Sequence, residues 1–166
     1  MNKLVINIIK LIAIGQILFV LGLFSYYVYI GLQWGFEERL ILLMVSDGIF
    51  ILFIFSSISI LLWKKWGWWL TVIIYCKLIL AKIITVISEI AMVLLGVIIE
   101  SIRINVILFD LFVILLYSVI VFIFLRPTIR QRFTIQMTGS RLSFFIIVST
   151  LILYFVHFII LLLTMS

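Results

Sequence analysis

The chain has 166 residues, of which 67% are hydrophobic and only 11% are charged. Soluble domains are about 45–50% apolar and about 25% charged, and a chain this short has too little interior to bury the excess apolar surface. These values exclude a water-soluble globule. The net charge of +6 comes from basic residues in short segments between apolar runs. We therefore assign this charge to membrane topology and anionic lipid, and expect no nucleic-acid partner.

The apolar runs are continuous and more than 20 residues long, which predicts membrane-spanning helices. We therefore predict an all-α membrane protein with a single transmembrane domain, residues 1–166. The domain is expected to be a five-span helical bundle in the cell (plasma or inner) membrane. The spans are expected at about 11–32, 40–63, 68–92, 106–125 and 142–165.

Three connecting features follow in chain order. Residues 1–10 are mildly amphipathic and are expected to rest at the interface. Lys64-Lys65 and the tryptophans at 66, 68 and 69 are expected to form a tight turn that anchors the bundle at the headgroup level. Arg126-Pro127 ends the fourth span, because proline cannot continue a helix without losing a hydrogen bond.

The third apolar run, residues 68–99, is too long for a simple crossing. It would measure about 48 Å as a helix, against a hydrocarbon core of about 30 Å. Either the helix ends near Glu89, or it continues past Glu89 and bends near Gly96. We favour the second alternative.

The basic residues predict the orientation of the bundle. Five spans place eight of them on the side of the amino terminus and leave two, Arg39 and Arg103, on the other side. Basic residues accumulate in cytoplasmic loops, so the amino terminus is expected inside and the carboxyl terminus outside. The eight are Lys3, Lys10, Lys64, Lys65, Arg126, Arg130, Arg132 and Arg141. The last six are expected to face the cytoplasm or lipid headgroups, and a specific docking role is the minor alternative.

Four ionisable residues on different spans form the candidate site. At a rise of 1.5 Å per residue they reach similar depths in the outer third of the bilayer. Ionisable groups at this depth are costly and usually face protein or water. We therefore expect an intramembrane polar cluster of Asp47, Lys82, Asp110 and His157.

Two interpretations of Lys82 stay open. It forms a structural salt bridge to Asp47 or Asp110, which is favoured because an unpaired charge there is costly, or it belongs to a ligand, ion or proton site. The secondary candidates are Glu89, Lys77 and Tyr154. Glu89 is expected at the outer interface, and Lys77 is expected to snorkel towards the cytoplasmic headgroups. His157 is expected to be hydrogen-bonded within the bundle, on one face with Tyr154.

Neither catalysis nor a cofactor is expected. One histidine and one cysteine do not make a metal site, and no phosphate-cradling glycine motif occurs. Asp47 and Asp110 could be compared with the aspartate pair of the lipoprotein signal peptidases, which are membrane enzymes of similar size. The asparagine-rich motifs that flank the aspartates of those enzymes are absent here, so this activity is not expected.

Two segments carry a local resemblance. Leu62-Trp63-Lys64-Lys65-Trp66-Gly67-Trp68-Trp69-Leu70 resembles the basic, tryptophan-rich hairpin of many small uncharacterised multi-pass bacterial inner-membrane proteins. The stretch from Phe124 through Arg126-Pro127 to Phe133 resembles the ending of their fourth span. Those proteins generally stop after four spans, whereas this chain adds a fifth. The resemblance implies the topology and a bacterial source, and implies no activity.

Two functions remain in view. One is a non-enzymatic accessory or immunity-type protein that binds another membrane component, which is another membrane protein, a second copy of the chain or the lipid bilayer itself. The alternative is a small transporter or channel component whose path uses the polar cluster.

Overall fold

The computed structural model describes residues 3–95, 104–137 and 139–165. Every regular element in these residues is a helix. The elements are α1 (Lys3–Trp34), α2 (Glu38–Ser46), the 3₁₀ helix η1 (Asp47–Phe50), α3 (Ile51–Leu61), α4 (Lys65–Leu94), α5 (Ile104–Leu125), α6 (Pro127–Arg132) and α7 (Gly139–Met165).

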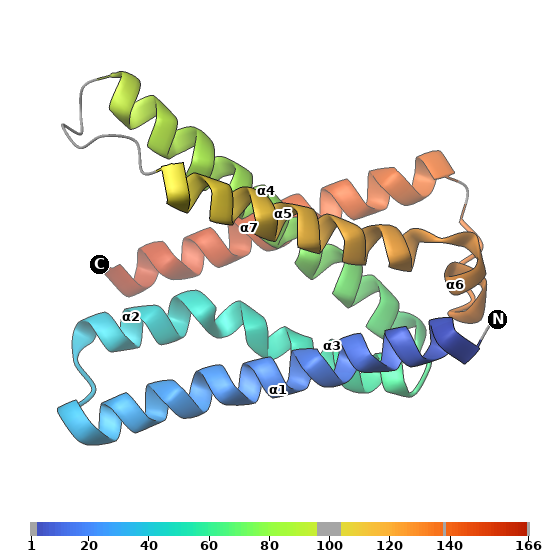
Figure 1. The fold of residues 1–166 in the computed structure, drawn as a ribbon, viewed down its shortest axis with the longest axis horizontal. Coiled ribbons are helices and arrows are strands. Elements are labelled where there is room, and N and C mark those ends of the chain that lie inside the picture. Colours follow the sequence, from blue (N-terminus) through green and yellow to red (C-terminus); the bar gives the residue numbers. More distant parts are fainter. Residues whose placement is uncertain (1–2, 96–103, 138, 166) are drawn as a thin grey trace.

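Five stretches are long and apolar enough to cross a membrane, which confirms the predicted all-α, five-span fold class. They are Val5–Trp34, Glu38–Leu61, Lys65–Leu94, Ile104–Leu125 and Gly139–Thr164. The second stretch is composite, because η1 separates α2 from α3. The amino terminus and α6 lie at one end of the bundle, and the carboxyl terminus lies at the other (Figure 1).

Helix α4 is central to the packing. It packs on α3, α5 and α7, while α1 packs on α3 and α2 packs on α7. With 30 residues it is about 45 Å long, and it crosses the other helices obliquely (Figure 1). It runs five residues beyond Glu89 to Leu94, so the favoured alternative for the third span is correct to that point. The bend expected near Gly96, and Arg103, lie outside the described residues.

The turns at the basic end are built from the backbone. At the end of α3, the Lys64 N–H donates to the Ser59 carbonyl at 2.8 Å and the Trp63 N–H donates to the Ile60 carbonyl at 2.9 Å. These two hydrogen bonds form the Schellman motif, in which one residue has a left-handed backbone conformation. Trp63 is that residue, with φ 55°. Thr134 ends α6 in the same way, with φ 57°. Both turns therefore reverse the chain without glycine.

Two expectations about this end are wrong. Residues 3–10, the described part of the segment 1–10, are not a separate interfacial piece, because they form the start of α1 and Ile9 packs in the core that contains Phe124 and Ile129. Trp68 is not a headgroup anchor, because it is completely buried and its indole N–H donates to the Phe124 carbonyl at 2.8 Å. Of the three tryptophans, Trp66 is the exposed one.

Candidate functional site

Most of the predicted polar cluster lines one hollow, which we call the polar chamber. Its volume is about 400 Å³, and it lies between the α2–η1 junction, α4 and α7. Three of the four predicted residues and two of the three secondary candidates line it. The polar residues around the chamber include Ser46, Asp47, Lys77, Lys82, Tyr154 and His157.

Asp110, the fourth predicted residue, reaches the chamber indirectly by pairing with Lys82. The Lys82 Nζ donates to Asp110 Oδ1 at 2.5 Å, and this ion pair links α4 to α5. The Asp110 side chain is 4% exposed, whereas the Lys82 side chain is 37% exposed. The aspartate is therefore held in the protein interior, and the lysine retains two further N–H donors that can face the chamber.

Lys77 and His157 form a second pair within the chamber. The Lys77 Nζ and His157 Nδ1 are 3.1 Å apart, and His157 Nε2 lies 2.9 Å from the Ser46 carbonyl. A carbonyl only accepts, so His157 Nε2 carries a proton and donates it. In the neutral imidazole, Nδ1 then accepts from the Lys77 ammonium. The prediction that His157 is hydrogen-bonded within the bundle agrees with this geometry.

Asp47 supplies the remaining charge of the chamber. Its carboxylate accepts a hydrogen bond from the Tyr27 hydroxyl of α1, and it lies within electrostatic range of Lys77 and His157. Together with Asp110, which pairs with Lys82 from outside the chamber lining, Asp47 gives two carboxylates for the two ammonium groups. Such a balanced arrangement lowers the cost of holding four charges at bilayer depth.

The chamber coincides with the break in the second span. Asp47 and Gly48 open η1, and both residue types are poor helix formers. A short 3₁₀ segment within a longer helix often marks a functional hinge or local strain. Here the break lets the carbonyl of Ser46 accept from His157, so α7 binds the second span at its irregular point.

One secondary candidate, Lys77, lies elsewhere than expected. The Lys77 side chain does not snorkel, because it is 4% exposed and contacts His157. It lies twelve residues into α4, about 18 Å from the basic end, which is beyond the reach of a lysine side chain. Glu89 lies five residues before the end of α4 that is remote from the basic end, and it does not line the chamber. Within the described part of the chain it forms no ion pair.

A neutral polar triad in the interior was not predicted. Gln16 Nε2 donates to the Tyr75 hydroxyl at 3.0 Å, and Gln16 Oε1 accepts from the Ser57 hydroxyl at 2.6 Å. All three residues are buried, and together they join α1, α3 and α4. The signal available in the sequence was the glutamine at the centre of an apolar span, because a buried amide needs partners.

The predicted basic residues gather at the end that holds α6. Arg126 lies 5.6 Å from the centre of the Phe122 ring, and Arg132 lies 5.1 Å from that of Trp63. Lys64, Lys65, Arg126, Arg132 and Arg141 are exposed, and Arg130 is half-buried. A second hollow, of about 550 Å³, opens here between α4 and the first turns of α7. We call it the basic-end hollow, and its lining includes Lys65, Trp66, Trp69, Met137, Phe145 and Ser149.

Comparison with models of protein families, with curated proteins and with solved structures finds no match to this chain.

Proposed function

We propose that the protein is a non-enzymatic accessory or immunity-type bundle that acts by binding another membrane component at its basic end. The observation that carries this proposal is the basic-end hollow. It combines one lysine with an aromatic lining at the level where a bundle meets lipid headgroups or a partner's loops.

The open packing of the bundle supports the same function. Helices α3, α5 and α7 each pack against α4, and only 6% of the apolar part of α5 is buried. Helices associate in lipid through close packing and polar contacts. The open faces of α5 and α7 leave room for the helices of a partner.

The test compares two serines of α7 that differ in position. Ser149 lines the basic-end hollow, whereas Ser143 is exposed and does not line it. The affinity-tagged protein is extracted from native membranes in a mild detergent, and co-purified components are quantified. We expect Ser149→Trp, which fills the hollow, to remove a component that co-purifies in fixed ratio with wild-type protein and with Ser143→Trp. Absence of any such component, or its equal recovery with Ser149→Trp, contradicts the proposal.

A second function is favoured by a different observation. The polar chamber places two ammonium groups, one imidazole and one carboxylate around about 400 Å³ beside a broken helix. Irregular backbone at membrane depth typically occurs where it lines a cavity. We infer, as the alternative function, that the protein is a small transporter or channel component that carries a proton or a small polar solute through this chamber.

Flux through reconstituted liposomes tests the second function. Lys82→Ala and Asp110→Asn alter the chamber's charge, so both are expected to change proton or solute flux. Glu89→Gln, outside the chamber, is the control and should leave flux unchanged. Flux that is the same with and without protein, or that ignores both chamber variants, excludes this function and leaves the first one standing.

A further inference from the structure

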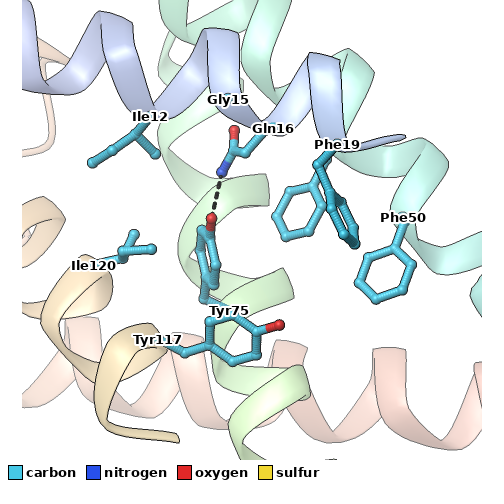
Figure 2. Close-up of a pocket in the computed structure, with 9 residues that line it drawn as sticks. Ile12, Gly15, Gln16, Phe19, Phe50, Tyr75, Tyr117 and Ile120 are labelled. Carbon is cyan, nitrogen blue, oxygen red and sulfur yellow. Dashed lines mark hydrogen bonds between the residues drawn. The ribbon is translucent and has the colours of Figure 1, made fainter. Parts of the chain in front are cut away.

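A third hollow, which we call the tyrosine cavity, lies against the polar triad. Its volume is about 230 Å³. Figure 2 shows Gln16 and Tyr75 meeting at its centre, Tyr117 below them and Phe19 with Phe50 to one side. Tyr75 is ten residues into α4, about 15 Å from the basic end, so the cavity lies near the middle of a hydrocarbon core of about 30 Å.

Three donor hydrogens at the cavity have no hydrogen-bond partner within the described residues. The Tyr75 oxygen accepts from Gln16, so its own O–H remains to be donated. The Tyr117 hydroxyl and the second Gln16 N–H also make no hydrogen bond within the described residues. The Gln16 carbonyl oxygen is already engaged by Ser57. A ligand that satisfies this site therefore has to bring acceptor atoms.

The walls of the cavity favour a flat ring over an alkyl chain. The rings of Phe53 and Tyr75 lie 5.1 Å apart, those of Tyr75 and Tyr117 lie 5.3 Å apart, and Phe19 meets Phe50 edge-on at 5.3 Å. Aromatic side chains prefer such offset or edge contacts with another ring.

The size and position of the cavity limit what it can enclose. Pockets for drug-sized ligands occupy about 300–1,000 Å³, so this smaller one holds a single substituted ring. Phe19 is 51% exposed and Gly15 is also exposed, so the cavity reaches the lipid-facing surface beside them. An alkyl tail attached to the ring would leave through this opening into the bilayer.

We propose that the tyrosine cavity binds the planar ring of a membrane-dissolved carbonyl compound of the quinone class, with Tyr117, Tyr75 and Gln16 donating hydrogen bonds to its oxygens. This site is separate from the polar chamber and from the basic-end hollow. It requires neither of the functions proposed above.

Two glycines of α1 provide a matched pair of variants. A Cβ added at Gly15 or at Gly22 would meet no other atom within 4 Å, so leucine fits at both positions. Leucine is also a better helix former than glycine. Only Gly15 lines the cavity. Gly15→Leu therefore fills the opening, and Gly22→Leu is the control two turns along the same helix.

The experiment titrates a benzoquinone with a short alkyl tail into nanodiscs that contain the purified protein. Binding is followed by quenching of intrinsic fluorescence and is corrected with empty nanodiscs. We expect saturable binding to wild-type protein and to Gly22→Leu, and none to Gly15→Leu. Loss of one hydrogen bond in Tyr117→Phe should weaken binding about fivefold, whereas Tyr26→Phe, which does not line the cavity, should not.

A second ligand tests whether the carbonyl is needed. An alkylbenzene with the same tail should compete at least about tenfold more weakly, because it brings no acceptor. Absence of saturable quinone binding, equal binding to Gly15→Leu, or equal competition by the alkylbenzene would each overturn the proposal.

Discussion

Lys77 and Lys82 lie five positions apart on α4 and have different partners. Lys82 pairs directly with a carboxylate, whereas Lys77 contacts a neutral imidazole and relies on Asp47 at longer range. The difference arises because residues five apart point about 140° away from each other on a helix. Lys82 therefore meets α5 while Lys77 meets α7, and α4 attaches to two different neighbours through these two lysines.

The Lys82–Asp110 pair gives the first prediction. Lys82→Met leaves the Asp110 carboxylate without its partner, and we expect a loss of about 3 kcal/mol in the free energy of unfolding. This value is the low end for a buried pair, because Lys82 is partly exposed. The double variant Lys82→Met/Asp110→Leu should recover most of the loss, since no unpaired charge remains. Unfolding by dodecyl sulfate in mixed micelles measures all three differences.

The neutral triad gives a second prediction with a smaller magnitude. Gln16→Leu removes the hydrogen bonds to Tyr75 and Ser57 while keeping the side chain's size. Side-chain hydrogen bonds in membrane proteins average about 0.6 kcal/mol each, so the expected loss of stability is about 1 kcal/mol. The same unfolding assay should rank this variant as milder than Lys82→Met. The reverse order would show that the triad, and not the ion pair, is the main polar link to α4.

The charged residues of the site could be predicted and the neutral ones could not, for a physical reason. A charge in an apolar run is so costly that its position alone marks a site, as it did for Asp47 and Lys82. Glutamine and tyrosine are tolerated in spans for many reasons, so Gln16 and Tyr75 gave only a weak signal. Whether Lys82 pairs with Asp47 or with Asp110 depends on how the helices pack against one another, and a single sequence does not show that packing.

At the scale of elements, α3 and α4 approach each other closely at Gly67. A Cβ at Gly67 would lie 2.5 Å from the Ile60 nitrogen and 2.6 Å from the Ser59 carbonyl carbon. These are backbone atoms, so a side chain here has to separate the two helices. Glycine is needed for close approach, while the left-handed turn itself is made by Trp63.

This contact gives a third prediction. Gly67→Leu should separate α3 from α4 and lower the amount of folded protein recovered in detergent, whereas Gly22→Leu should not. A side chain at 67 meets backbone that cannot rotate away, and one at 22 meets nothing within 4 Å. Thermal unfolding monitored by size-exclusion chromatography compares the two variants. Equal midpoints would mean that the α3–α4 pair tolerates separation.

The elements themselves were largely predictable because a membrane span needs about 20 apolar residues regardless of its partners. Their ends were less predictable. Helix α1 begins before its expected start, since nothing in residues 3–10 stops a helix. At the break, the Ser46 carbonyl accepts from His157 of α7, which is 111 residues distant in sequence. Local propensity at Asp47-Gly48 indicates where the second span can break, but which helix meets the break depends on tertiary packing.

At the scale of the whole molecule, the five long apolar helices found in the described residues place the two termini at opposite ends, and the basic residues of the turn before α4, of α6 and of the start of α7 lie at one of these ends. The amino terminus, the turn before α4 and helix α6 share that end, as Figure 1 shows for the terminus and α6. Which end faces the cytoplasm depends on the membrane that receives the chain. The charge distribution provides the physical basis for a prediction, because positively charged loops are retained on the cytoplasmic side.

The fourth prediction is therefore the orientation. Alkaline phosphatase, which is active only outside the cytoplasm, should be active when fused after Ser166 and inactive when fused after Ser140. A fluorescent protein that matures only in the cytoplasm should give the opposite pattern at both positions. Charge dominates this outcome, so replacing Lys64, Lys65, Arg126, Arg130, Arg132 and Arg141 with neutral residues should produce mixed orientations. An active phosphatase after Ser140 in the unaltered chain would reverse the assignment and place the basic-end hollow outside the cell.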